Sequence, residues 1–276
     1  MTGDAWAVFA WQGLRLRVPS GWELASAVGT QAEGKVRLDD ENGPRLEIEW
    51  QKKRRFRPEL ACEKTARRMR ERAKKSGRRI ELQTDTLDEG RLVRMLWSGD
   101  EAGGAFIGYC PRCRRAVRGQ VIGASLPEEL LADVQLCSCG QPETEWAVYG
   151  LRVRLPGGWK LAATVFRPGL IRLRFRRRLA KITVTRWAAA QIVLRDCTLQ
   201  QWLGEVRKEL GLRGCRAESG VRHGHDAVSV RCGAAAWKRN AALWRCDRSH
   251  RLFAVVGHGT DADTTEAVVD SLLCHG

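Results

Sequence analysis

The chain has 276 residues, of which 43% are hydrophobic and 29% are charged, and its formal net charge is +16. A chain of this length has room for two domains with packed cores. The charged fraction excludes a membrane-embedded protein, and no apolar run reaches the roughly 18 residues that a transmembrane helix needs. The N-terminus also lacks the basic and apolar segments of a signal peptide, so we expect a cytoplasmic protein.

The positive charge comes mainly from arginine. Lys and Arg together number 48 against 32 Asp and Glu, and 38 of the 48 are Arg. Such an excess favours polyanionic partners, chiefly nucleic acid or anionic lipid. GC-rich coding would produce the same arginine bias, so composition alone leaves both origins open.

The first half of the chain shows both strand and helix periods. Leu14–Val18 alternates apolar residues with arginines, which is the pattern of a half-buried strand, and Pro19 ends it. A helix is predicted over residues 58–75, with Pro58 in its first turn. A closing helix is predicted from Pro127.

The second half repeats the first. GLRLRVPSGWELA at Gly13–Ala25 returns as GLRVRLPGGWKLA at Gly150–Ala162. A helix with a stronger apolar stripe is predicted near residues 199–210, and a closing helix is predicted from Asp261 or Asp263. A repeat of this length indicates two homologous domains.

The predicted fold class is therefore α+β. We expect two homologous tandem domains, residues 1–140 and 141–276, each an antiparallel sheet packed with about two helices. The strand that ends in VPSGW (Val18–Trp22) or LPGGW (Leu155–Trp159), followed by a meander, a long helix, further strands and a last helix, resembles the Mog1/PsbP-like fold. That resemblance implies a binding or assembly factor rather than an enzyme.

Four cysteines close the first repeat with the spacing of a metal site. Cys110-Pro-Arg-Cys113 is separated by 23 residues from Cys137-Ser-Cys139. Four Cys are a standard tetrahedral set for zinc. We therefore predict a structural zinc ion at Cys110, Cys113, Cys137 and Cys139, which closes the first domain.

The second repeat ends in a corresponding way. Cys246-Asp-Arg-Ser-His250 is separated by 23 residues from Cys274-His275. Zinc accepts either Cys or His, so the exchange between repeats fits a metal better than a disulfide. We predict a second structural zinc ion at Cys246, His250, Cys274 and His275. Because adjacent residues rarely direct both side chains to one metal, His258 is an alternative to His275.

Other uses of the cysteines fit the sequence less well. A redox CxxC pair stands at the start of a helix, whereas RRAVRGQVIG after Cys113 has the pattern of a strand. Disulfides need an oxidising compartment, for which nothing in the sequence argues. The remaining cysteines have no ligand-like spacing and are predicted to be small buried hydrophobic side chains: Cys62, Cys197, Cys215 and Cys232.

One segment is a candidate for catalysis. The string His223-Gly-His225-Asp226 can bind a metal, so a metal-dependent hydrolase that uses His223, His225 and Asp226 is a remote alternative. A turn with two exposed histidines is the favoured interpretation. The sequence carries no nucleophile elbow, phosphate loop or dinucleotide fingerprint, so we predict that the protein is not an enzyme.

Basic residues gather in places that suit phosphate. The predicted nucleic-acid contacts are Lys52, Lys53, Arg54 and Arg55 ahead of the first long helix, Arg67 and Arg68 on it, and Arg172, Arg174 and Arg176. The last three should form a row on one strand face, roughly 7 Å apart. A solvated face, or protection of a sheet edge, would produce the same row. Trp11, Trp237 and Trp244 have no repeat-equivalent partner and are predicted to be exposed for stacking.

These features predict a non-enzymatic, zinc-stabilised binding protein. Its expected partner is the backbone of RNA or DNA, within a larger nucleoprotein assembly. The alternative is a protein–protein adaptor or assembly factor for an acidic partner. No membrane partner is expected.

Overall fold

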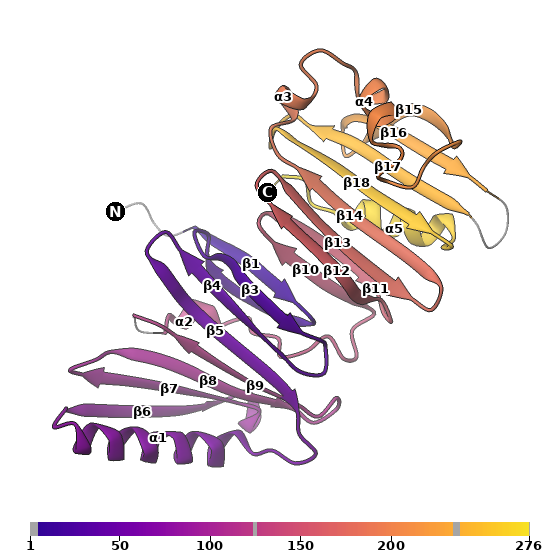
Figure 1. The fold of residues 1–276 in the computed structure, drawn as a ribbon. Coiled ribbons are helices and arrows are strands. Elements are labelled where there is room, and N and C mark those ends of the chain that lie inside the picture. The colour runs from indigo at the N-terminus through magenta and orange to yellow at the C-terminus, as the bar shows by residue number, and fades with distance from the viewer. Residues whose placement is uncertain (1–4, 124–125, 234–237, 276) are drawn as a thin grey trace. The chain divides into compact units, whose positions relative to one another are not determined.

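The computed structural model describes residues 5–123, 126–233 and 238–275 (Figure 1). The chain divides into two compact units, Met1–Gln141 with Ala147–Tyr149, and Pro142–Trp146 with Gly150–Gly276. The homology of residues 1–140 and 141–276 stays a prediction. Within the described residues, no helix combines the length and the apolar character needed to span a membrane.

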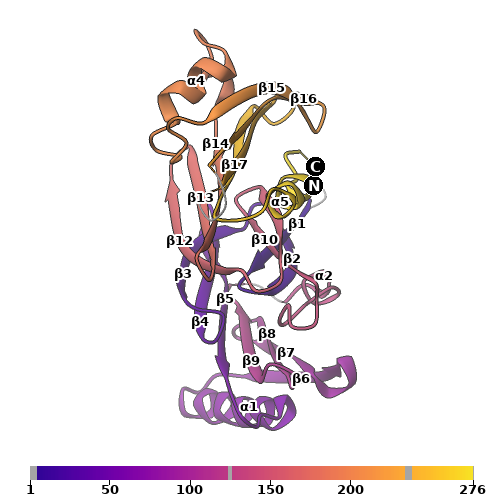
Figure 2. The ribbon, with the colours of Figure 1, turned by 90° about the vertical axis from the view of Figure 1, so that its right-hand side faces the viewer.

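The main layer of the first unit is a seven-stranded antiparallel sheet with the order β3-β4-β5-β9-β8-β7-β6. Helix α1 packs on it, because Cys62 and Ala66 contact Val93, Met95 and Ile107 (Figure 2). Strands β1 and β2 form a separate antiparallel pair. The elements are β1 (Trp6–Trp11), β2 (Leu14–Pro19), β3 (Glu23–Gly29), β4 (Gly34–Asp40), β5 (Gly43–Lys52), α1 (Pro58–Lys75), β6 (Ile80–Leu87), the 3-10 turn η1 (Asp88–Gly90), β7 (Leu92–Gly99), β8 (Gly103–Cys110), β9 (Arg115–Val121) and α2 (Glu128–Leu131).

The second unit has a seven-stranded antiparallel sheet of the same topology, with the order β12-β13-β14-β18-β17-β16-β15. One face of the sheet packs against α3 and α4, where Trp202 and Leu203 of α4 and Leu243 of β17 are buried. Trp146 packs against Phe175, with ring centroids 5.0 Å apart. The elements are β10 (Glu143–Val148), β11 (Leu151–Pro156), β12 (Lys160–Arg167), β13 (Leu170–Arg177), β14 (Ala180–Trp187), α3 (Ala190–Val193), α4 (Leu199–Val206), β15 (Arg216–Arg222), β16 (His225–Cys232), β17 (Arg239–Cys246), β18 (Arg251–His258) and α5 (Ala262–Ser271).

The predicted α+β class, with about two helices packed on each sheet, is wrong. Strand accounts for 51% of the protein and helix for 18%, and the strands form three antiparallel sheets. The helix predicted from Pro127 lasts only from Glu128 to Leu131. The helix predicted over residues 199–210 ends at Val206, and the chain then turns at Gly211, whose φ is +71°. These two helices are therefore shorter than predicted, and part of each apolar stripe lies in the turn that follows the helix. Strand hairpins supply much of the packing.

Two tryptophans predicted to be exposed lie in the core instead. Trp11 is 3% exposed and Trp244 is 0% exposed. Trp244 stacks on Phe253, which lies opposite it on the neighbouring strand. The third, Trp237, lies outside the described residues. Lack of a repeat-equivalent partner is thus a poor signal of exposure, because a core side chain can differ between similar sheets.

Candidate metal centres

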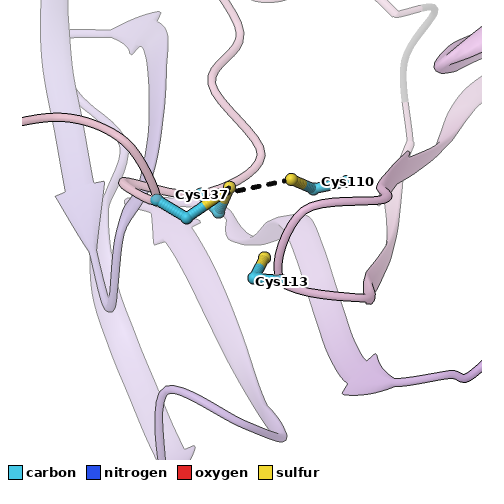
Figure 3. A group of neighbouring side chains, drawn as sticks. Cys110, Cys113 and Cys137 are labelled. Carbon is cyan, nitrogen blue, oxygen red and sulfur yellow. Dashed lines mark hydrogen bonds between the residues drawn. The ribbon is translucent and has the colours of Figure 1, made fainter.

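The first candidate centre lies in the first unit and contains all four cysteines that the sequence analysis grouped. The sulfur atoms of Cys110, Cys113, Cys137 and Cys139 all lie within 4.8 Å of one another. The Sγ atom of Cys139 is 3.3 Å from that of Cys110 and 2.9 Å from that of Cys137. Figure 3 shows the thiols of Cys110, Cys113 and Cys137 converging on one point. Such a group could hold a metal ion.

Two distant segments deliver these thiols. Cys110 ends β8 and Cys113 lies in the turn before β9, while Cys137 and Cys139 follow α2. The later segment is fixed to β2 by two hydrogen bonds: the Arg15 N–H donates to Gln135 O, and the Gln135 N–H donates to Arg15 O. Gly13 makes room for it, because a Cβ there would lie 2.9 Å from the Ser138 backbone nitrogen.

The crowded thiols perturb one another's ionisation. Burial opposes ionisation of Cys110, but hydrogen bonds from the Cys113 backbone and from the neighbouring thiols outweigh it and lower the pKa of Cys110 to about 7. Burial raises the pKa of Cys113 to about 11, and burial followed by the Cys139 thiol raises the pKa of Cys137 as well. One thiolate forms readily beside these thiols, and a cation is needed before all four can ionise together.

A buried guanidinium lies beside the same thiols. Arg115 is 2% exposed, and its charge is attracted to the cysteine group. Burial lowers the pKa of Arg115 to about 10. Its Nη1 donates to Gln12 O at 2.6 Å, and its guanidinium carbon lies 4.8 Å from the Trp50 ring centroid. Its Nε and Nη2 have no hydrogen-bond partner among the described residues. A buried cation with such sparse bonding fits a neighbour of net negative charge.

The second candidate centre lies in the second unit and contains His225, Cys246, Cys274 and His275. The Nδ1 atom of His275 is 3.4 Å from Cys246 Sγ, 3.2 Å from Cys274 Sγ and 3.4 Å from His225 Nε2. Burial lowers the pKa of His225, and His275 lowers it further, so the imidazole is held in its neutral, metal-binding form. The adjacent residues Cys274 and His275 both contribute, and His258 is not part of the group.

His225 takes the place that the sequence analysis gave to His250. The two hairpins have the same register, with Cys110 opposite Arg115 and Cys246 opposite Arg251. Cys113 lies two residues before Arg115, and Ser249 lies two residues before Arg251, so Ser249 occupies the position that corresponds to Cys113.

His250 corresponds to Arg114 in these turns, and both residues have left-handed backbones, with φ of 51° and 59°. The ligand position of the turn is therefore held by Ser249. Its Oγ is buried without a hydrogen-bond partner in the described part of the chain. The fourth donor comes instead from His225, at the start of the neighbouring strand. An alignment of the two turns from the second strand of each hairpin would have shown that His250 lies one residue beyond the position of Cys113.

The string His223-Gly-His225-Asp226 is divided by the fold. His225 joins the second group, whereas His223 Nε2 lies 3.0 Å from Val269 O and its ring packs near Trp244. Asp226 is an exposed residue of β16, opposite Val221. The three side chains predicted for a hydrolase therefore do not share one metal group in the described structure.

The four other cysteines have different roles. Cys62, on the inner face of α1, is buried in the core, as predicted, and Cys197 packs at the edge of the second core. Cys215 and Cys232 form a disulfide. The expectation that these two are unlinked hydrophobic side chains is therefore wrong. They flank the β15–β16 hairpin, where Arg216 lies opposite Arg231, so the antiparallel pairing itself brings them together.

The predicted nucleic-acid residues lie in two units. In the first, Lys52 ends β5 and is followed by Lys53, Arg54 and Arg55, and all four are exposed, as are Arg67 and Arg68 of α1. In the second, Arg174 and Arg176 are exposed, but Arg172 is 5% exposed. Arg172 donates hydrogen bonds to Thr185 Oγ1 and to Glu209, so the predicted row of three outward arginines is interrupted.

The chain is similar in structure to two solved proteins, but only weakly. The solution structure of cyanobacterial PsbP (CyanoP) from Synechocystis sp. PCC 6803 matches with a TM-score of 0.31 and 15% identity, over 51% of this chain and 99% of that one. MucB, in a crystal structure with MucA(peri), matches with a TM-score of 0.22 and 14% identity, over 94% of this chain and 81% of that one. No family model and no curated protein matches. Likeness at this level carries no argument about function.

Proposed function

We propose that the protein is a non-enzymatic, zinc-stabilised binding protein that contacts the backbone of RNA or DNA within a larger nucleoprotein assembly. The observation that carries the zinc part is the pair of compact four-donor groups, one Cys₄ and one Cys₂His₂. These are the two donor sets most typical of structural zinc. Four protein donors occupy every tetrahedral position, which leaves none for a reacting water.

The donor distances suit zinc. Four sulfurs at about 2.3 Å from a tetrahedral zinc ion lie about 3.8 Å apart. The Sγ–Sγ separations of 2.9 and 3.3 Å, with the 4.8 Å upper limit, lie on either side of that value. Mixed nitrogen and sulfur donors lie somewhat closer to each other, in keeping with separations of 3.2 and 3.4 Å around His275.

Charge supports the same assignment in the first unit. Four thiolates around a divalent ion carry a net charge of −2, which would offset the buried guanidinium of Arg115. Without such an anion, burial of that cation would cost several kcal/mol (on the order of 3–5). The sparse hydrogen bonding of Arg115 is thus explained by long-range attraction to the whole centre.

The nucleic-acid part of the proposal rests on α1 and the segment before it. Residues 52–75 contain twelve Lys and Arg against three Glu. Because α1 buries Cys62 and Ala66, the helical period directs Arg67, Arg68 and Lys75 away from the core. Only the Arg67–Glu71 pair, at 3.7 Å, joins opposite charges along the described helix. This exposed cationic face of the helix, about 27 Å long, suits contact with a phosphate backbone.

Anisotropy titration against short single- and double-stranded RNA and DNA at several salt concentrations tests this surface. We expect submicromolar binding at low salt with a steep negative log–log slope. The double variant Arg67→Glu/Arg68→Glu should weaken binding to all sequences and flatten the slope by about 2. The control Arg213→Glu/Arg216→Glu changes two exposed arginines of the second unit. Failure of the wild type to bind any of the four, while it forms a stable protein complex, would favour the adaptor.

A further inference from the structure

Basic side chains form a line across four strands of the second unit. In the ladder, Arg176 of β13 lies opposite Lys181 of β14, Lys181 lies opposite His258 of β18, and His258 lies opposite Arg239 of β17. Directly opposed residues project from the same face of a sheet, and neighbouring strands lie about 4.8 Å apart. The line, which we call the cross-strand row, therefore spans roughly 14 Å.

The cross-strand row lines one cavity of about 790 Å³. The segment Lys208–Gly211, just after α4, forms part of its wall. Seven Lys and Arg line it against a single carboxylate, that of Glu209. Glu209 is already bonded to Arg172. None of Arg174, Arg176 and Lys181 forms an ion pair among the described residues.

This arrangement costs stability unless an anion is bound. Like charges directly opposite one another in a sheet repel, and apolar or opposite-charge pairs would be better for folding alone. The row also has fixed parts. Arg239 Nη1 donates to Gly211 O at 3.0 Å, and a Cβ on Gly211 would lie 3.0 Å from His258 Cε1. The Lys208–Gly211 segment thus holds two of the basic groups in place.

We propose that this cavity binds a chain of phosphoryl groups, held by the cross-strand row of Arg176, Lys181, His258 and Arg239. Such a chain is carried by a free nucleoside polyphosphate or by the 5′-triphosphate end of a nucleic acid. The site goes beyond the backbone contact of α1 and stands without it. Charge-assisted hydrogen bonds to phosphoryl oxygens are among the strongest available to Arg and Lys.

The rest of the cavity suits the nucleoside part of such a ligand. Leu179, in the turn between β13 and β14, is 87% exposed and lines the cavity with Ala162 and Ala163. This apolar surface lies at the Arg176 end of the cross-strand row. The hydroxyl-bearing Thr183 lies opposite Arg174, one step further along the strands. The cavity therefore offers apolar contact at one end and anion recognition along its length.

The state of His258 gives a readout that an occupant of the cavity would change. Burial lowers the pKa of His258, and Arg239 and Lys181 lower it further, against a hydrogen bond to the Leu210 backbone. These groups face it from β17, β14 and the segment after α4. Phosphoryl groups placed on the row would raise that pKa by offsetting the neighbouring charges.

Isothermal titration of the full-length protein, purified without chelator, tests the proposal with sodium tripolyphosphate and with ATP as probes. The variant Arg176→Gln/Lys181→Gln should weaken binding of both about a hundredfold, because each of the two lost charge-assisted bonds is worth roughly a factor of ten. The variant Arg213→Gln/Arg216→Gln is the matched control and should bind as the wild type does.

NMR titration of the His258 ring provides a measurement that does not depend on a variant. We expect tripolyphosphate to raise the pKa of His258. An unchanged His258 pKa, no binding of either probe, or equal weakening in the two variants would each overturn the proposal.

Two further arms identify the source of the phosphoryl chain. Tighter binding of ATP than of tripolyphosphate assigns a free nucleotide. Tighter binding of a 5′-triphosphate RNA than of the same RNA with a 5′-hydroxyl assigns a nucleic-acid end. Loss of RNA binding in Arg67→Glu/Arg68→Glu, with tripolyphosphate binding retained, separates this site from the surface of α1.

Discussion

The two candidate metal centres use the same hairpin turn and obtain different ligands from it. In the first, the turn between β8 and β9 supplies two thiols, and the segment after α2 supplies two more. In the second, the matching turn supplies only Cys246, and the strand beside it supplies His225. Backbone register is the same in both hairpins, whereas the donors are not. The same hairpin register is therefore compatible with a donor from the turn in one unit and a donor from the neighbouring strand in the other.

The largest effect should follow from breaking the first centre. We expect Cys113→Ser to unfold the first unit and to lower the zinc content from two ions per chain to one. Structural zinc contributes on the order of 10 kcal/mol in small domains, which exceeds the stability of many of them. Metal analysis with limited proteolysis checks this, and protection of the second unit is the internal control. Full zinc content in the variant would contradict the Cys₄ assignment.

The second centre should distinguish His225, which belongs to the group, from His250, which is close in sequence to Cys246 but lies outside it. His225→Ala should remove one zinc ion and destabilise the second unit, because it removes one of four donors. His250→Ala should retain both ions, because that side chain lies outside the group. Zinc analysis and thermal unfolding of both variants decide the matter. Loss of metal only in His250→Ala would restore the arrangement expected from sequence.

A covalent link distinguishes the second unit from the first. Cys215 and Cys232 are 17 residues apart. Closing a loop of that size stabilises by about 3 kcal/mol. We expect Cys215→Ser/Cys232→Ser to lower the free energy of unfolding of the second unit by about that amount and to leave the first unit unchanged. Denaturant unfolding without reductant measures it, and titration of the denatured wild type should find eight free thiols.

The smallest of these effects concerns the charge beside the first centre. Arg115→Met keeps most of the side-chain volume and removes the guanidinium, so metal affinity should fall about 10- to 100-fold, as for other residues that support a ligand set. Arg251 occupies the same hairpin position in the second unit but is half-exposed. Arg251→Met should therefore change affinity less. Competition with a chromogenic chelator gives both values, and equal losses would remove the special role of Arg115.

The sequence predicted the donors of the first centre because all four lie in two short, closely spaced strings. It missed His225 because that residue is 21 positions before Cys246 and is brought close only by the pairing of β16 with β17. The strands around Leu14–Val18 and the helix from Pro58 were visible because they have strict periods and a proline at a boundary. The balance of helix and sheet was not visible, since the apolar residues around Leu130 and Leu203 do lie in helices but do not show how soon those helices end.

The basic residues show the same limit. Spacing along one strand suggested a row of Arg172, Arg174 and Arg176. Which of them reaches solvent depends on the segment after α4, which covers Arg172 with Glu209. The row that lines the cavity runs across the strands, through residues 63 positions apart in sequence at Arg176 and Arg239. The period of residues along the chain cannot show which side chains lie opposite one another on neighbouring strands. Only the register of the paired strands shows it.

The placement of the ligands also has a consequence for the order in which the protein is made. In each unit two ligands lie earlier in the chain, and the last two follow the final helix of the unit. On the ribosome, Cys110 and Cys113 therefore emerge while their partners Cys137 and Cys139 are still to be synthesised. The centre can close only after every strand of that sheet has left the exit tunnel. Metal capture would thus act as a late step that seals a finished sheet rather than as a nucleus around which the sheet forms.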